Sequence, residues 1–180
     1  MSNLENKLKK IVDTFNNVNR EIAFNDIKKL SKKYNKNISV QNVLFQIAKK
    51  SGDIDGDVYT GTETVKYLAS GVPDRIFFAT NKSSLTTASR ATLRKQATYL
   101  RKNKKLSVTI EGHADERGTR EYNLALGERR ANAARDYLMT YGISGKRMSV
   151  ISYGKERPVN SESTPLAWSQ NRRSVTVKVN

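Results

Sequence analysis

The clearest hydrophobic pattern predicts a strand, a polar loop and a long helix between residues 106 and 141. In the segment LSVTIEG, apolar and polar residues alternate, which is the period of a strand with one buried face. Gly112 and Gly118 bracket the polar loop that follows, where the chain must turn. Beyond the loop, apolar residues recur at helical spacing as far as Tyr141, and Gly142 is expected to end the helix in the left-handed conformation that glycine favours.

One face of this predicted helix is apolar except for a single charge, Arg130, whereas its neighbour Arg129 points the other way. An unpaired buried charge costs several kcal/mol or more, so Arg130 requires an anionic partner. One interpretation is an internal salt bridge to Glu111, Asp115 or Glu116. The other is a binding site at the loop–helix junction, built from the Asp115 carboxylate, the Arg130 guanidinium and the free N–H groups of the first helical turn. Such a site would suit a zwitterionic ligand with an ammonium and a carboxylate close together.

Further strands and a helix are predicted on both sides of this unit. Strands are predicted in DRIFFAT (74–80), RMSVISY (147–153) and SVTVKV (174–179). Between the first of these strands and LSVTIEG, Thr86 or Thr87 is expected to cap a second helix. A loop with two prolines is predicted before the last strand.

In the last predicted strand, Val175, Val177 and Val179 share one face with Arg173, whereas Arg172 points the other way. The order β-α-β-α-β-loop-β predicts an α+β fold, a two-layer sandwich in which the helices cover one side of a four-stranded sheet. The last strand joins the sheet without a crossover helix, so we expect the sheet to be mixed.

The sequence before this domain divides into a helical extension and a linker. Residues 1–50 carry apolar residues at helical spacing, most regularly from Leu4 to Val18. Residues 51–73 are rich in Gly, Asp, Thr and Ser and are interpreted as a linker. The globular domain is therefore predicted to span residues 74–180.

Composition narrows the functional classes. The chain has no cysteine, which excludes disulfides and thiolate metal sites, and no apolar run approaches the roughly 18 residues of a membrane span. The net charge of +16 is spread along the chain and favours anionic partners, so binding to nucleic acid or another anionic surface is the alternative function. No zinc-finger, RNP or helix-turn-helix pattern supports a nucleic-acid partner, and none is expected.

Catalysis is not expected, and neither is a metal or other cofactor. The only histidine, His113, lies close to Asp115, but a catalytic zinc site usually needs three protein ligands. A serine nucleophile would need a strained turn, and the GxSxG pattern that forms one is missing. His113 is therefore interpreted as a packing residue or a hydrogen-bond donor.

Several ordered motifs resemble the signature of OmpA-like peptidoglycan-binding domains. The resemblance rests on DERGTREYN, GERRAN, SYGKERP and NRR and extends over about residues 74–179. Within this family it is greatest to the peptidoglycan-associated lipoproteins of the Tol–Pal system. The resemblance implies the OmpA-like β-α-β-α-β-β fold and non-covalent binding of the diaminopimelate in the peptidoglycan stem peptide, which would tether the outer membrane to the cell wall.

The resemblance also assigns ligand-binding residues. Asp115 and Arg130 stand at the family's ligand-pairing aspartate and arginine. Asn123 matches a family asparagine, and Leu126 matches a pocket-wall position. The implied lining of the pocket mouth consists of Glu116, Arg117, Gly118 and Thr119.

At the pocket edge the chain departs from the family pattern. Many members end their first strand in Phe-Asp, where this chain has Thr80 and Asn81. Asn81 can still form hydrogen bonds, but a ligand ammonium loses a second carboxylate at this edge.

The resemblance further implies a TolB-like propeller protein docked on the same face, contacts with other Tol–Pal or outer-membrane proteins, and a place at the periplasmic face of the Gram-negative outer membrane. A lipoprotein of this kind starts with a signal peptide and an acylated cysteine, and this sequence has neither. We expect it to be a mature or trimmed form that lacks the anchor cysteine. A stator- or porin-type relative is disfavoured because the sequence has no membrane segment.

Overall fold

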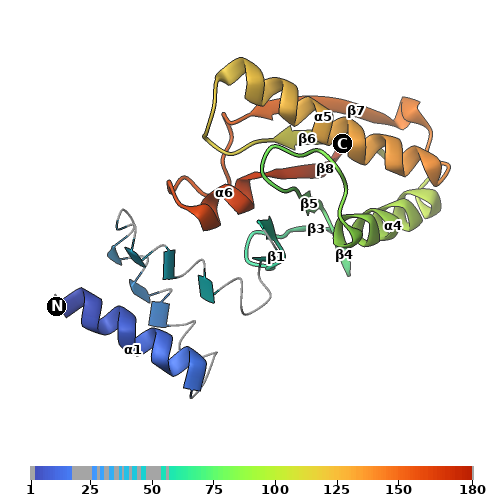
Figure 1. Ribbon diagram of the computed structural model, residues 1–180. Helices are drawn as coiled ribbons and strands as arrows, with labels where there is room; N and C mark the ends of the chain where they lie inside the picture. Colours follow the sequence, from blue (N-terminus) through green and yellow to red (C-terminus); the bar gives the residue numbers. More distant parts are fainter. Residues whose placement is uncertain are drawn as a thin grey trace.

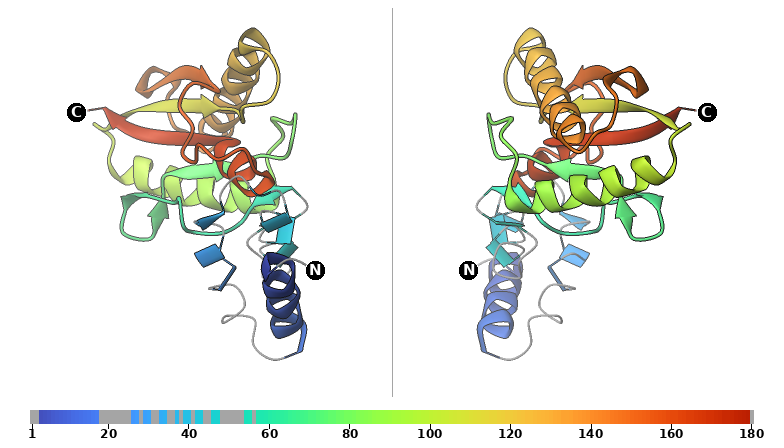
Figure 2. Two further views of the ribbon diagram at one scale, coloured as in Figure 1. Left: turned by 90° about the vertical axis from the view of Figure 1, so that its left-hand side faces the viewer. Right: turned by 90° about the vertical axis from the view of Figure 1, so that its right-hand side faces the viewer.

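The structure is a computed structural model that describes residues 3–17, 54–55 and 57–179, together with short stretches between residues 26 and 47. The first helix, α1, spans Asn3–Asn17, which confirms the helical start of the extension. The rest of the extension, residues 18–50, which was also predicted to be helical, lies partly outside the described residues. Figures 1 and 2 show α1 apart from the main sheet and the C-terminus at the far end of the last strand.

The domain is built on a four-stranded mixed sheet. Its strands are β5 (Arg75–Phe77), β6 (Ser107–His113), β7 (Met148–Gly154) and β8 (Arg173–Val179), in the spatial order β5-β8-β6-β7. The pair β6–β7 is parallel, whereas β8 is antiparallel to both of its neighbours. The helices α4 (Thr87–Lys102) and α5 (Arg120–Thr140) connect β5 to β6 and β6 to β7, and they pack on the sheet (Figure 1). The predicted α+β sandwich with a mixed sheet is thereby confirmed.

The core between the helices and the sheet follows the predicted alternation. Leu93 and Leu100 of α4 and Leu138 of α5 meet Val108 and Ile110 of β6, and all five are almost completely buried. The polar residues of LSVTIEG face the other side of the sheet. Burying each of these aliphatic side chains contributes about 1.5–3 kcal/mol, which makes this cluster a main source of stability for the domain.

Helix α5 lies directly on β6 because two glycines meet. A Cβ atom on Gly112 would lie 1.7 Å from the carbonyl oxygen of Gly127, so only glycine fits at this crossing. This contact, about two turns into α5, holds the N-terminal part of the helix next to the end of β6. The loop between them is therefore held close to the carboxyl end of the strand.

The helices begin and end largely where the sequence predicts. The hydroxyl of Thr86 accepts a hydrogen bond from the Ser89 N–H and caps α4, and Thr119 caps α5 in the same way through Tyr122. Gly142 follows α5 with φ of 80°, as predicted. A short 3-10 helix, Gly145–Arg147, then leads into β7.

A second apolar cluster lies on the other face of the sheet. Its centre is Phe77 of β5, whose ring lies 4.9 Å from that of Tyr59, and Leu166 packs beside them. The extension contributes Leu8 and Ile11 of α1 to the same cluster. The described part of the extension is therefore in contact with the domain.

Two hairpins occupy the segment that was interpreted as a linker. Strand β1 (Ile54–Asp55) pairs with β2 (Val58–Tyr59), and β3 (Tyr67–Ala69) pairs with β4 (Val72–Pro73). The predicted boundary between linker and domain at residue 74 stays a prediction.

The structure differs in two features from what the sequence predicts for residues 158–179. The proline-containing loop holds a helix, α6 (Pro165–Asn171), capped by Thr164. In β8 the predicted shared face of Val175, Val177 and Val179 turns away from the helices, and only Val175 is buried there. Among the described residues, no helix is long and apolar enough to cross a membrane.

Candidate functional site

A pocket of about 240 Å³ opens where the β5–α4 loop, the β6–α5 loop and the first turns of α5 meet. Two parts of the chain that are far apart in the sequence, residues 80–81 and 115–126, supply its walls. The lining consists of Thr80, Asn81, Asp115, Arg117, Gly118, Tyr122, Asn123 and Leu126. Seven of these eight residues are among the ten that the family resemblance assigned to the ligand site. The other three assigned residues, Glu116, Thr119 and Arg130, lie next to the pocket without lining it.

Asp115 is the buried carboxylate of the pocket. Its Oδ1 accepts hydrogen bonds from the backbone N–H and Nε of Arg117 at 3.1 and 2.9 Å, and its Oδ2 accepts from Nη2 of Arg117 at 2.8 Å. Nη1 of Arg172 donates to the same Oδ2 at 3.1 Å. Burial would raise the pKa of Asp115, but the hydrogen bonds from Arg117 and Arg172 bring the pKa below its ordinary value. The carboxylate is therefore charged at neutral pH.

Arg130 does not pair with a carboxylate. It is completely buried, and its guanidinium donates to three backbone carbonyls, those of Lys82 at 2.9 Å, His113 at 2.8 Å and Ala79 at 3.1 Å. The predicted internal salt bridge is therefore wrong within the described part of the chain. Burial, and then the nearby charge of Arg172, lower the pKa of Arg130 to about 9.

These three carbonyls explain the position of Arg130 behind the pocket. Two belong to the β5–α4 loop and one to the end of β6, so the guanidinium ties together the two loops that form the pocket walls. Carbonyl oxygens carry only partial charge, but three of them satisfy a buried guanidinium. A direct contact between Arg130 and a ligand stays a prediction.

Arg172, which was not among the predicted site residues, is the second partner of Asp115. It is almost fully buried and also donates to the carbonyls of Phe78 and Asp57. Asp57 accepts a further hydrogen bond from the Thr80 N–H at the pocket edge. The strand pattern placed Arg172 on the face opposite the valines, but it could not indicate the partner, because Arg172 and Asp115 lie 57 positions apart.

The loop after β6 is held in place from outside the pocket. The Glu116 carboxylate accepts from the indole N–H of Trp168 at 2.8 Å and from the Ser163 hydroxyl at 3.0 Å. The Lys155 ammonium donates to the carbonyl of Gly118 at 2.7 Å. Glu116 therefore faces α6 and fixes the loop.

Tyr122 lines the pocket and was missed by the sequence analysis. Its hydroxyl donates to the side-chain oxygen of Asn81, which bridges α5 and the β5–α4 loop at the pocket mouth. Asn81 adopts the left-handed conformation, with φ of 61°, which asparagine tolerates better than most residues. The position of Tyr122, one helical turn before Leu126, was the signal that could have revealed it.

No group of three or more potential metal ligands occurs in the part of the chain that the structure describes. His113 is buried at the end of β6, with its Nε2 3.3 Å from a Glu111 oxygen, and burial lowers its pKa to about 3.

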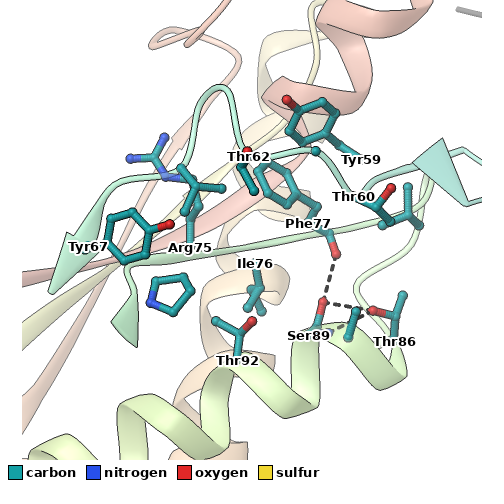
Figure 3. A pocket seen from close by; sticks show the side chains of 15 residues that line it. Tyr59, Thr60, Thr62, Tyr67, Arg75, Ile76, Phe77, Thr86, Ser89 and Thr92 are labelled. Atoms are coloured by element: carbon teal, nitrogen blue, oxygen red, sulfur yellow. Dashed lines mark hydrogen bonds between the residues drawn. The ribbon is translucent and has the colours of Figure 1, made fainter. Parts of the chain in front are cut away.

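A second pocket, of about 200 Å³, lies between α4 and the segment that leads to β3 (Figure 3). Its polar groups are engaged with one another, because the Ser89 hydroxyl donates to the Phe77 carbonyl and Thr86 caps the helix. Its only charged side chain, Arg75, is paired with Asp74 at 2.8 Å. None of the predicted site residues lines this pocket.

Comparison with known proteins identifies relatives of the domain. The peptidoglycan-associated lipoprotein of Rhizobium meliloti (strain 1021) is 59% identical over 106 residues, which cover 59% of this chain and 60% of the relative. The protein of the same name from Brucella melitensis is 57% identical over 106 residues, covering 59% of this chain and 63% of that protein. The match thus spans about three fifths of the length of these curated relatives.

Solved structures agree with the fold. The crystal structure of the peptidoglycan-associated lipoprotein from Burkholderia pseudomallei is 38% identical, covers 59% of this chain and 90% of its own, and has a TM-score of 0.58. The C-terminal domain of Helicobacter pylori MotB is 18% identical with a TM-score of 0.56, which shows a shared fold alone. The model of the OmpA family matches residues 77–172, more than half of the sequence, and the chain therefore belongs to the OmpA family.

Proposed function

We propose that this protein binds peptidoglycan without a covalent bond, by holding the diaminopimelate of a stem peptide in the pocket at the start of α5. The observation that carries the proposal is the convergence of seven predicted ligand residues around one pocket of about 240 Å³. The whole of α4 and β6 separates Thr80 and Asn81 in the sequence from the other five residues. The proposal involves no catalytic step.

The charges around the pocket suit a zwitterionic ligand. Asp115 supplies a negative charge, whereas Arg117 and Arg172 supply positive charges beside it. The first turn of α5 adds backbone N–H groups and the positive end of a 21-residue helix. An ammonium and a carboxylate on one carbon, as at the free end of diaminopimelate, would find partners of opposite charge within the same pocket.

The names of the relatives support the cellular role that we propose. Proteins named peptidoglycan-associated lipoprotein share 55–59% identity with this domain over 105–106 residues. We propose that this chain likewise links the outer membrane to the wall at the periplasmic face. The membrane part of this proposal follows from the word lipoprotein in the names of these relatives.

A TolB-like propeller is the protein partner that we propose for the same face, with other Tol–Pal or outer-membrane proteins as further partners. The pocket rim presents the exposed residues Glu116, Arg117 and Glu121. Charged groups at a rim govern the rate and specificity of association more than its strength. A partner seated there would cover the pocket.

Co-sedimentation with purified sacculi tests the peptidoglycan proposal. The full chain should sediment with diaminopimelate-type sacculi and should be released by a soluble muropeptide. Thr80→Trp places a bulky ring on the exposed pocket edge and should abolish binding, whereas Thr98→Trp, an equally exposed site on α4, should leave it unchanged. If both variants sediment like the parent protein, the pocket is not the binding site.

One observation favours a second candidate function, the binding of an anionic surface. No Asp or Glu occurs between Asp74 and Glu111, a stretch with nine Lys or Arg residues. Five of these lie on α4, namely Arg90, Arg94, Lys95, Arg101 and Lys102, and all five are exposed. A helix with charges of a single sign attracts anionic polymers by screened electrostatics.

The double variant Arg101→Glu/Lys102→Glu separates the two candidates. Under the peptidoglycan proposal it binds sacculi like the parent protein, because the pocket is untouched. Binding that vanishes in this variant and falls steeply with salt, while Thr80→Trp binds normally, would favour the anionic-surface function.

A further inference from the structure

The Asp115 carboxylate has no acceptor site left for a ligand. A carboxylate offers about four lone-pair positions. Three are taken by Arg117, through its backbone N–H, Nε and Nη2, and the fourth by Nη1 of Arg172. A ligand ammonium can reach Asp115 only if one of the two guanidinium groups leaves.

The two arginines differ in how firmly they are held. The Arg172 side chain is 3% exposed and is also bound to the carbonyls of Phe78 and Asp57, so it is fixed from several sides. The Arg117 side chain is 42% exposed and lines the pocket itself. Its other polar contact is a long hydrogen bond of 3.4 Å to the Thr80 hydroxyl. Arg117 is therefore the group that can leave.

The structure also provides a contact that can hold the Arg117 side chain after it has left Asp115. The Arg117 guanidinium lies 4.3 Å from the centre of the Trp168 ring, a cation–π contact. Trp168 is held by its hydrogen bond to Glu116, the neighbour of Arg117 in the sequence. An arginine that gives up Asp115 can keep this aromatic contact and turn its guanidinium outward.

We infer that Arg117 is an internal competitor that occupies the ammonium position of the pocket and gives way when a ligand ammonium binds Asp115. This inference rests on the proposed function and specifies how its pocket selects a ligand. A ligand without an ammonium cannot displace the guanidinium from Asp115. The pocket thereby discriminates in favour of wall peptides with a free amino group on diaminopimelate.

Removal of the competitor should strengthen binding. When Arg117 is bound to Asp115 in most molecules of the free protein, only the remaining fraction can bind the ligand, and the apparent affinity falls by that fraction. Arg117→Ala makes Asp115 accessible in every molecule and restores the full affinity. Calorimetric titration of the full chain with a muropeptide that carries the free diaminopimelate amine should give at least about tenfold tighter binding for Arg117→Ala than for the parent protein. Arg117→Gln, which removes the charge but keeps a polar side chain, should change in the same direction.

A matched control removes the effect of charge alone. Arg120 is the first residue of α5, three positions after Arg117. It is exposed and pairs with Glu156 at 3.4 Å rather than with Asp115. Arg120→Ala loses the same charge and should bind within about twofold of the parent protein, because exposed charges are screened. The same muropeptide acetylated on the diaminopimelate amine should gain nothing from Arg117→Ala.

The outcomes are distinguishable. Binding that is unchanged or weaker in both Arg117 variants would overturn the inference and leave the proposed function standing, since the parent protein still binds. An equal gain in Arg120→Ala would overturn it as well, by assigning the gain to net charge. Failure of every form to bind either muropeptide or sacculi would overturn the proposed function itself, and this inference with it.

Discussion

Replacement of Arg130 by alanine should destabilise the domain, and the structure allows the size of the effect to be worked out. The substitution removes three hydrogen bonds and leaves the carbonyls of Ala79, Lys82 and His113 without this donor. The hydrogen bond to His113 is buried and those to Lys82 and Ala79 are partly buried, so each lost bond costs at most about 1–3 kcal/mol, and relaxation of the loops or entry of water recovers part of this. The substitution also removes the unfavourable free energy of burying the Arg130 charge. The free energy of unfolding is therefore expected to fall by about 3–5 kcal/mol.

Urea denaturation followed by circular dichroism measures this loss. A loss of about 3–5 kcal/mol is a large part of the 5–15 kcal/mol that stabilises a typical domain, so the midpoint should shift strongly or the variant should fail to fold. Arg130→Lys keeps the charge, but a single ammonium cannot span all three carbonyls, and an intermediate loss is expected. Arg129→Ala, at the exposed neighbouring position, should stay within about 0.5 kcal/mol of the parent protein.

The reasoning fails if Arg130→Ala unfolds at the same urea concentration as the parent protein. In that case the three carbonyls would be satisfied without the guanidinium, and the role of Arg130 would lie in ligand binding alone. A variant that keeps its stability and loses sacculus binding would support the family assignment of Arg130 as a direct ligand partner.

Four further predictions follow from other contacts. Gly112→Ala should lower the melting temperature sharply, because its Cβ would meet the Gly127 carbonyl at 1.7 Å; thermal unfolding measures this. The folded-state pKa of Asp115 lies below its ordinary value of 3.8, so its contribution to stability is present above about pH 4 and is lost as the pH falls through the folded-state pKa. Unfolding of the parent protein and of Asp115→Asn should therefore converge at low pH; a constant difference would contradict this. A fragment of residues 57–180 should be more stable in urea than one of residues 74–180, because only the longer keeps the Tyr59–Phe77 contact. In a titration, a soluble muropeptide should displace the TolB-like partner, and independent binding of both would show separate surfaces.

The periodic parts of the fold were readable from the sequence because a buried strand or helix face repeats at a fixed interval. The alternation in LSVTIEG predicted correctly which side of β6 faces the helices, and the caps of α4 and α5 lie at threonines that precede apolar repeats. Helix α6 has only seven residues, too few for a repeat to be visible. Its start was nevertheless marked by Thr164 and Pro165, a capping residue followed by proline at the first helical position.

The candidate site was readable only as far as it follows from local sequence and family resemblance. The resemblance brought together seven lining residues, but the electrostatic partners follow from loops that meet in three dimensions. The helical pattern correctly indicated that Arg130 is buried, yet the step from burial to a carboxylate partner failed, because backbone carbonyls of any residue type can satisfy a guanidinium. Conversely, the strand pattern gave only the face on which Arg172 lies, and the structure shows that Arg172 is the buried partner of Asp115.

Arg172, and not Arg130, is the buried arginine that pairs with Asp115, and this changes the expected charge distribution of the pocket. With Arg130 engaged by carbonyls, its charge contributes to the pocket through space, and Asp115 is balanced by Arg117 and Arg172 instead. Since Arg172 is also tied to Asp57, the segment before β5 contributes to the electrostatics of the ligand site. The hairpin of β1 and β2, which contains Asp57, thus acts on the same pocket as the loops of the domain. Its loss in a shortened fragment should weaken ligand binding as well as the fold, because the Arg172 guanidinium would lose one of the contacts that hold it against Asp115.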